Sequence, residues 1–126
     1  MSDKLSIIVN GEEREIFMSF GLLNHLCNVV GTIENVPLIS IDVELRNTIL
    51  PLTLAERTKS GKLINKELPE VDDFEITVED GEKLLEWVTD HAGNFFIKAL
   101  ETARRLESNN KDRLQGLMQS SDGSKS

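Results

Sequence analysis

The stretch that decides the fold is "TVEDGEKLLEWVTDHAGNFFIKALETARRLES", residues 77–108. Its apolar residues recur at intervals of three and four, which predicts an amphipathic helix over 78–107. Thr77 is a suitable N-cap, and the acidic residues of the first turn favour the positive end of the helix dipole. The predicted apolar stripe contains Leu84, Leu85, Val88, Ala92, Phe95, Phe96, Ala99, Ala103 and Leu106.

The length of this helix exceeds what a small domain needs to cover its core. A helix of about 30 residues extends about 45 Å. We therefore expect its distal half either to project or to pack on another subunit.

The N-terminal stretch "KLSIIVNGEEREIFM", residues 4–18, predicts a β-hairpin. Asn10-Gly11 in its middle is the strongest short turn signal, because both central residues of a type I′ turn need a positive φ. A two-stranded hairpin is marginal in water, so its apolar face must be covered. The next segment is the obvious cover.

That segment, residues 19–30, predicts a second amphipathic helix. Ser19 is a plausible N-cap and Gly31 a plausible C′ residue. His25 and Cys27 are only two residues apart, so on a helix they point in different directions. This spacing favours a small buried thiol and a histidine at the edge of the stripe over a catalytic dyad. The apolar residues at helical spacing are Leu22, Leu23, Leu26, Val29 and Val30.

The middle of the chain gives weaker signals. Residues 37–41 fit either a short strand or an extended connection. Asp42 is a good N-cap for a helical region over 42–57, and Pro51 inside that region should kink or divide it. Residues 58–76 contain turn formers and acidic residues and predict a surface connection.

The predicted organisation is one globular domain over 1–108 and a polar, largely disordered tail over 109–126. The last residues of the tail contain no apolar side chain, and just before them lie Leu114, Leu117 and Met118. They fit either a fraying extension of the long helix or a short docking segment. The fold class is mostly α with an N-terminal β-hairpin (α+β), in which amphipathic helices surround one small core.

Composition narrows the classes of function. The chain has 126 residues and a net charge of −8, which argues against a nucleic-acid binder and against an anionic membrane surface. No apolar run approaches the roughly 20 residues of a membrane span, and the N-terminal apolar stretch is shorter than the roughly 7–15 residues of a secretory signal. The single cysteine cannot form an internal disulfide. We therefore expect a cytoplasmic protein without a targeting segment.

The sequence contains no recognisable catalytic or metal-binding constellation. The two histidines, His25 and His91, are far apart in the sequence and neither belongs to a metal-binding spacing. Neither Gly-rich phosphate motif occurs, and no serine nucleophile elbow is present. We expect a non-enzymatic protein with no cofactor and no metal.

Two segments resemble a known family. "VNGEEREIFMSFGLLNHLCNVVG", residues 9–31, and "VDDFEITVEDGEKLLEWVTDHAGNFFIKAL", residues 71–100, are similar to the tail assembly chaperones of long-tailed, siphovirus-type bacteriophages. The resemblance extends roughly from Ile7 to Leu106. It implies a protein of the infected bacterium's cytoplasm that binds and solubilises the tape measure protein and helps to recruit tail tube subunits. It also implies that the protein is absent from the finished virion.

The candidate partner-binding residues rest on expected exposure along the two best-defined helices. Phe95, Phe96 and Leu100 fit equally well as part of the domain's own core. Self-association through the long helix is a further expectation. The candidates are Phe20, Leu23 and Leu26 on the first helix and Trp87, Phe95, Phe96, Leu100 and Leu106 on the long one.

Two other classes of function stay open on sequence grounds. One is a structural virion component, such as a small tail or head-completion protein. The other is an acidic adaptor or inhibitor, such as a DNA mimic, which would bind its target with steep salt dependence.

Overall fold

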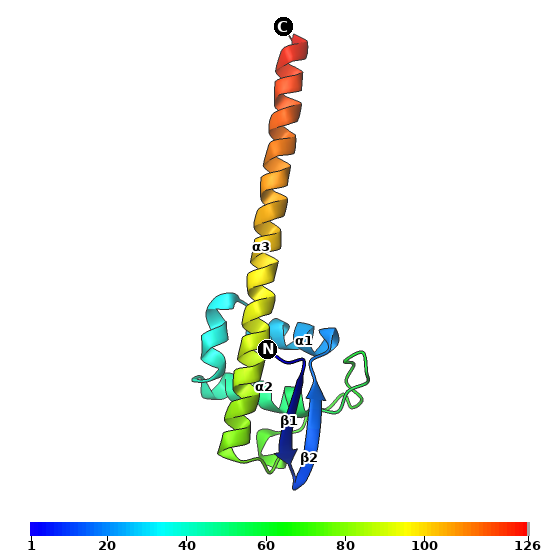
Figure 1. Ribbon diagram of the computed structural model, residues 1–126, viewed down its shortest axis with the longest axis vertical. Coiled ribbons are helices and arrows are strands. Elements are labelled where there is room, and N and C mark those ends of the chain that lie inside the picture. The colour runs from blue at the N-terminus through cyan, green and yellow to red at the C-terminus, as the bar shows by residue number, and fades with distance from the viewer. Residues whose placement is uncertain (126) are drawn as a thin grey trace. The chain divides into compact units, whose positions relative to one another are not determined.

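A computed structural model describes residues 1–125 of the chain, with side chains described for residues 1–116. The chain forms two units, Met1–Phe96 and a second that begins at Ile97. The fold is mostly helical with an N-terminal two-stranded antiparallel hairpin (Figure 1), which confirms the predicted fold class.

The hairpin consists of β1 (Lys4–Val9) and β2 (Glu12–Phe17). Asn10 and Gly11 have φ values of 54° and 78°, so both central residues have the positive φ that a type I′ turn requires. The pairing of Val9 with Glu12 fixes the register. The alternation of buried and exposed residues along β1 shows that one face of the hairpin is packed and the other is open.

Helix α1 (Phe20–Val30) confirms the second predicted helix. The backbone N–H of Leu22 donates to Ser19 Oγ at 3.1 Å, so Ser19 is the N-cap. Gly31 closes the other end with a φ of 88° and donates its N–H to the Cys27 carbonyl at 2.8 Å. Local sequence alone is sufficient to define both ends of this helix.

The segment after α1 corrects one prediction. Residues Ile33–Ile39 form a 3₁₀ helix, η1, and neither a strand nor an extended connection. Ile33, Val36 and Ile39 are three residues apart, which is the period of a 3₁₀ helix, and Val36 and Ile39 are buried. The apolar period of three therefore gives this element its packed face.

Helix α2 (Val43–Leu54) begins as predicted at Asp42, whose carboxylate accepts from the Leu45 N–H at 2.9 Å. Pro51 does not divide the helix, and the helix ends at Leu54 rather than at residue 57. Because proline has no N–H, Pro51 removes the helical hydrogen bond to the Asn47 carbonyl. Asn47 is exposed, so water can bond this carbonyl instead. All residues from Ile49 to Leu54 are buried, so packing holds this turn in place.

A loop over residues 57–63 follows, closed by a bridge between Arg57 and Leu63. Gly61 lies at the point where this loop meets α1. It has a φ of 96°, and a Cβ at this position would lie 2.8 Å from the Leu22 nitrogen and would collide with Ser19 Oγ. The loop therefore approaches the first turn of α1 more closely than a side chain permits. A short 3₁₀ helix, η2 (Val71–Asp73), leads on to the last helix.

Helix α3 (Val78–Lys125) begins where the sequence predicts, since the Asp80 N–H donates to Thr77 Oγ1 at 3.1 Å. It continues past residue 107, where we expected it to end, through the segment that we expected to be largely disordered. Glu107 and Lys111 form an i,i+4 ion pair at 4.0 Å, and good helix formers surround the asparagines of this segment. The predicted apolar residues Leu117 and Met118 lie outside the described side chains.

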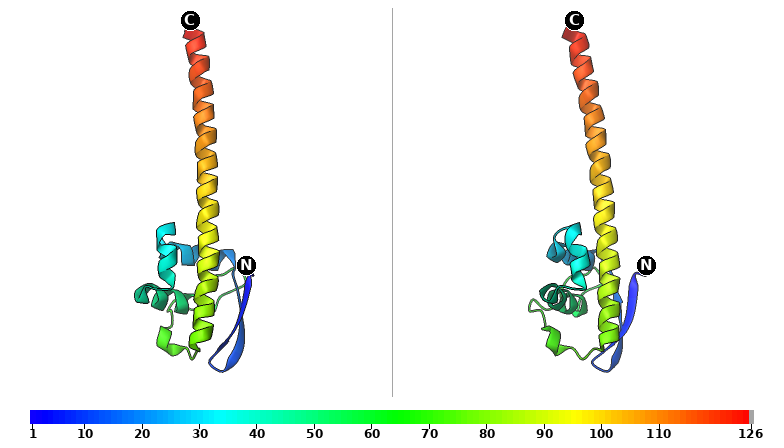
Figure 2. Two further views of the ribbon diagram at one scale, coloured as in Figure 1. Left: turned by 60° about the vertical axis from the view of Figure 1, so that its left-hand side comes forward. Right: turned by 90° about the vertical axis from the view of Figure 1, so that its left-hand side faces the viewer.

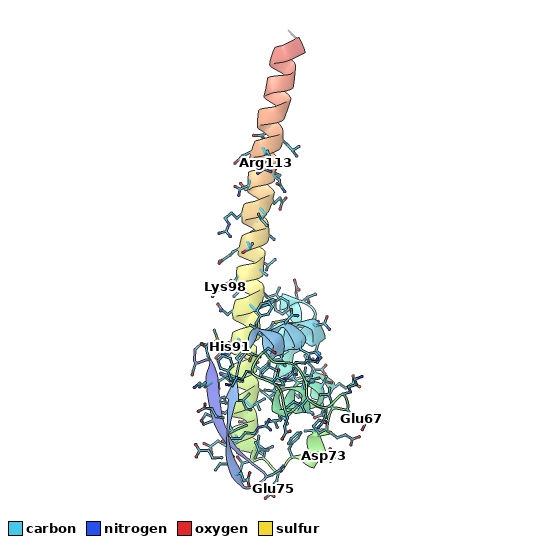
Figure 3. All side chains as sticks on the ribbon, turned by 90° about the vertical axis from the view of Figure 1, so that its right-hand side faces the viewer. Glu67, Asp73, Glu75, His91, Lys98 and Arg113 are labelled. Atoms are coloured by element: carbon cyan, nitrogen blue, oxygen red, sulfur yellow. The ribbon has the colours of Figure 1, made fainter. Side chains whose placement is uncertain are left out.

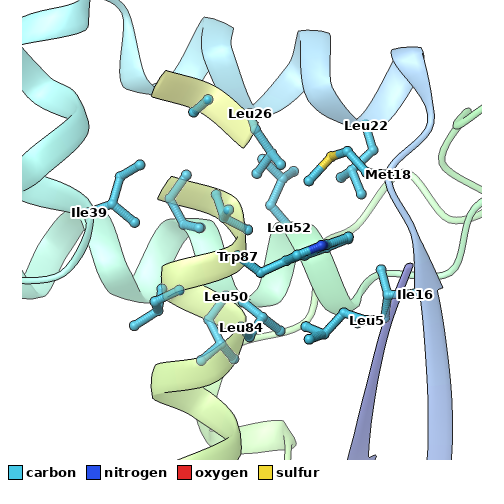
Figure 4. Close-up of a cluster of buried hydrophobic side chains, with 14 of the residues drawn as sticks. Leu5, Ile16, Met18, Leu22, Leu26, Ile39, Leu50, Leu52, Leu84 and Trp87 are labelled. Carbon is cyan, nitrogen blue, oxygen red and sulfur yellow. The ribbon is translucent and has the colours of Figure 1, made fainter. Parts of the chain in front are cut away.

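The core of the first unit forms around the initial turns of α3. Figure 2 shows this part of α3 with the hairpin on one side and η1 and α2 on the other. Leu84 and Trp87 of α3 meet Leu5 and Ile16 of the hairpin and Leu50 of α2 (Figure 4).

Among the described residues, no helix has the length and apolarity to cross a membrane.

The N-terminus is held on α3 by a single carbonyl group. Trp87 Nε1 donates to the Ser2 carbonyl at 2.7 Å, and His91 Nε2 lies 2.8 Å from the same oxygen. Because a carbonyl can only accept, His91 carries its proton on Nε2. The two rings also pack edge to face with centroids 5.2 Å apart.

Gly61→Ala should destabilise the protein by at least about 1–2 kcal/mol, because alanine at a positive φ is strained and its Cβ collides with α1. Gly81→Ala is the matched control: no atom lies within 4 Å of the new Cβ, and alanine should stabilise the helix by up to about 1 kcal/mol. Urea denaturation measures both changes. Equal stability of the parent and Gly61→Ala would show that the loop does not pack on α1.

Candidate functional site

Two of the predicted partner-binding residues belong to the core. Leu26 is 0% exposed, and Trp87 is 7% exposed with its indole N–H bonded to Ser2. The expectation that both are exposed, on which their choice as candidates rested, was wrong. Sequence periodicity places such residues on an apolar stripe but does not show which part of the stripe the domain itself covers.

Of the next four candidates, three are half-buried and one is exposed. Phe20 is the first residue of α1 and is 75% exposed. Leu23 is half-buried against the core, and so are Phe95 and Phe96, whose rings pack edge to face with centroids 5.8 Å apart. The structure thus supports the alternative that the two phenylalanines complete the core, and leaves Phe20 as the exposed aromatic side chain among the four.

The remaining candidates, Leu100 and Leu106, lie in the second unit, where every described side chain, residues 97–116, is exposed. Leu100 is 42% exposed and Leu106 is 55% exposed. Figure 3 shows the side chains of this segment, Lys98 and Arg113 among them, pointing outward all round the helix. Large apolar side chains on a helical segment without a buried face of its own indicate an unfilled interface.

We define the exposed helix face as Leu100, Ala103, Leu106 and Leu114. Three-residue steps connect the first three of these, and Leu114 follows Leu100 by two heptads, so all four lie towards one side of the helix. The sequence analysis quoted Leu114 but did not include it among the binding candidates. Its exposure in the structure adds it to the face.

The charges of the two segments differ in sign. Residues 97–116 contain five basic and three acidic residues, whereas residues 1–96 contain eight basic and 18 acidic ones. The exposed helix face therefore lies on a mildly basic segment of α3, although the protein as a whole is acidic. Opposite charge at the rim of an interface steers association, so this helix suits an acidic or neutral partner.

The structure does not bring His25 and Cys27 together as a reactive pair. Cys27 is buried, and desolvation raises the pKa of its thiol to about 11. The Arg57 guanidinium lies 3.4 Å from His25 Nδ1, which therefore accepts. Burial, with a smaller effect from the charge of Arg57, lowers the pKa of His25. Within the described residues, no group of three or more His, Cys, Asp or Glu side chains could hold a metal ion.

Arg57 has an organising role that the sequence did not signal. Its guanidinium donates to the Leu52 carbonyl at 3.1 Å and to the Gly61 carbonyl at 2.7 Å. These bonds connect the end of α2 with the 57–63 loop. An isolated arginine in a connecting segment has no characteristic local pattern, so only the folded chain shows what it contacts.

The sequence matches no protein-family model, no curated protein and no solved structure. The resemblance to tail assembly chaperones therefore rests on the two segments quoted from the sequence, and its functional content is a proposal.

Cys27 should react with a disulfide reagent such as DTNB at least about 100-fold more slowly in the folded protein at pH 8 than in urea, because its raised pKa and its burial both suppress the thiolate. Cys27 is the chain's only cysteine, so the absorbance change reports on it alone. Equal rates in the folded and unfolded protein would contradict the burial of this side chain.

Proposed function

We propose that this protein is a non-enzymatic assembly chaperone that uses the exposed helix face to bind an amphipathic helix of a long partner protein. The observation that supports this function is the exposure of Leu100, Leu106 and Leu114 on a helix whose described side chains beyond Phe96 are all exposed. An amphipathic helix that lies against another is a recurring mode of protein recognition.

The energetics favour a helical partner for this segment. Most helix stability in proteins comes from packing of an apolar face, and the segment from residue 97 to 116 has no packed face of its own. Burying a leucine side chain contributes about 1.5–3 kcal/mol. Two or three leucines on one face therefore provide a substantial part of the free energy needed to hold a partner helix.

The resemblance implies that the partner is the tape measure protein of a phage tail, with tail tube subunits as later recruits. A tape measure protein is a long helix with exposed apolar stripes, which aggregates unless it is covered. In this proposal the protein acts in the cytoplasm of the infected bacterium and leaves before the virion is complete. The mildly basic helix does not favour a DNA mimic, which needs a continuous acidic surface.

Co-expression with the tape measure protein of the same genome tests the proposal through solubility and co-purification. The variant Leu100→Glu/Leu106→Glu should weaken the complex about 30-fold or more, because loss of an interface anchor costs about 2 kcal/mol or more. Both residues are exposed, so the fold of the first unit should persist, which circular dichroism and thermal unfolding can check.

Ser108→Glu/Gln115→Glu is the matched control, because it adds the same charge to exposed positions that are not three or four residues from any member of the exposed helix face. It should bind as tightly as the parent.

A tape measure protein that remains insoluble while this protein stays folded would contradict the chaperone function. Recovery of this protein from purified particles by mass spectrometry would instead support a structural virion component. Light scattering distinguishes a partner complex from self-association.

A further inference from the structure

A groove of about 450 Å³ lies alongside β2, at a distance in sequence from the exposed helix face. One wall is β2 itself, from Arg14 to Phe17, and the other is the segment from Thr53 to Lys59. Ile16 and Leu22 provide apolar lining. Its volume falls within the range of about 300–1,000 Å³ that is typical of ligand sites.

The edge of β2 that borders this groove is unpaired. On the opposite edge of the hairpin, the Ile8 N–H donates to Asp80 Oδ2 of α3 at 3.1 Å, so that edge is occupied. Along an antiparallel pair, the N–H and C=O groups of successive residues point alternately towards the paired strand and away from it. Ile8 is opposite Glu13, so the backbone groups of both residues point away from the paired strand. Glu13 and Glu15 therefore turn their N–H and C=O groups away from β1, to the free edge of β2, and among the described residues no hydrogen bond to them is present.

Three cationic side chains line the groove of this acidic protein: Arg14, Arg57 and Lys59. Burial lowers the pKa of both arginines, because each guanidinium has lost part of its hydration. Arg57 Nε is buried without a hydrogen-bond partner among the described residues. Desolvated guanidinium groups with unused donors favour a carboxylate, which accepts from them in a bidentate arrangement.

Two acidic side chains face this cationic group. Burial lowers the pKa of Arg14, and the negative charge of Glu56 raises it by a smaller amount. Glu15 also lines the groove, but its carboxylate is paired with Lys4 at 3.5 Å. The groove therefore keeps a net positive charge.

We propose that this groove binds an extended peptide segment of a partner protein in which acidic and basic residues alternate, and which adds to β2 as a third strand. The main chain of the segment bonds the free N–H and C=O groups of Glu13 and Glu15. Alternate side chains of the segment point into the groove, where their carboxylates meet Arg14, Arg57 and Lys59. The side chains between them lie beside Glu13 and Glu15 on the outer face, where basic residues fit best.

A second copy of this chain does not suit the groove. Pairing β2 with β2 of another copy would place Glu13 and Glu15 near the same residues of the partner strand, and like charges across a pair are destabilising. Acidic residues on an exposed edge are a common means of preventing such pairing. The occupant that fits is a segment whose charges alternate in sign.

A fluorescein-labelled peptide of alternating lysine and glutamate, KEKEKEKE, tests the site by anisotropy at low salt. The composition-matched control, KKEEKKEE, places both charges on each face of a strand and should bind at least about tenfold more weakly. Methylating alternate backbone nitrogens of KEKEKEKE on the edge that faces β2 should abolish binding, because it removes the strand's donors. Equal binding of all three peptides would overturn strand addition in favour of unspecific ionic attraction.

Variants of the protein locate the site. Lys59→Gln should weaken the KEKEKEKE complex about tenfold, whereas Lys62→Gln, an exposed lysine of the same loop outside the groove, should leave it unchanged. Arg14→Gln should weaken it further, and thermal unfolding checks that it folds. In heteronuclear NMR spectra, the amides of Glu13 and Glu15 should shift on binding. No measurable binding, or equal loss with both lysine variants, would refute the site.

Discussion

The rest of the structure depends on burial of the first turns of α3. Leu84, Val88 and Ala92 are four residues apart on this helix, and each is completely buried. A two-stranded hairpin has no independent stability in water, so β1 and β2 exist because this face of α3 covers them. Helices α1 and α2 and the 3₁₀ helix η1 complete the enclosure around the same turns.

Specific bonds then fix the hairpin on that helix. The Asn10 N–H donates to the Glu75 carbonyl at 2.8 Å, and the Glu75 N–H donates to Asn10 Oδ1 at 2.7 Å. At the other end of β1, the Ser2 carbonyl accepts from Trp87 and His91. Strand β1 is thus attached at both ends to α3 or to the segment that precedes it, and β2 is left as the strand with a free edge. The groove beside β2 follows from this asymmetry.

Much of the fold could be predicted because its signals are local. Asn10-Gly11 specifies its turn through backbone conformation, and Ser19, Asp42 and Thr77 specify helix starts through bonds to nearby N–H groups. The errors arose where distant packing outweighs local preference. Pro51 remains inside α2 because its turn is buried, and Ile33–Ile39 forms a 3₁₀ helix because two of its side chains enter the core.

The functional surfaces were harder to predict because exposure is a property of the whole fold. Leu26, Trp87 and Leu100 all occupy apolar positions at helical spacing, but only Leu100 is exposed. The groove depends on contacts between β2 and the segment after α2, which no local pattern indicates. The difference in charge between residues 1–96 and 97–116 was visible in the sequence and separates the two proposed surfaces.

Hydrogen–deuterium exchange on the protein alone and in its complex with the tape measure protein tests the central claim most directly. The account predicts slow exchange for amides over residues 84–92 in both samples, because these turns are in the core. It predicts fast exchange over residues 97–116 in the free protein and strong protection in the complex. A complex without added protection in 97–116 would contradict the assignment of the exposed helix face as the partner-binding surface.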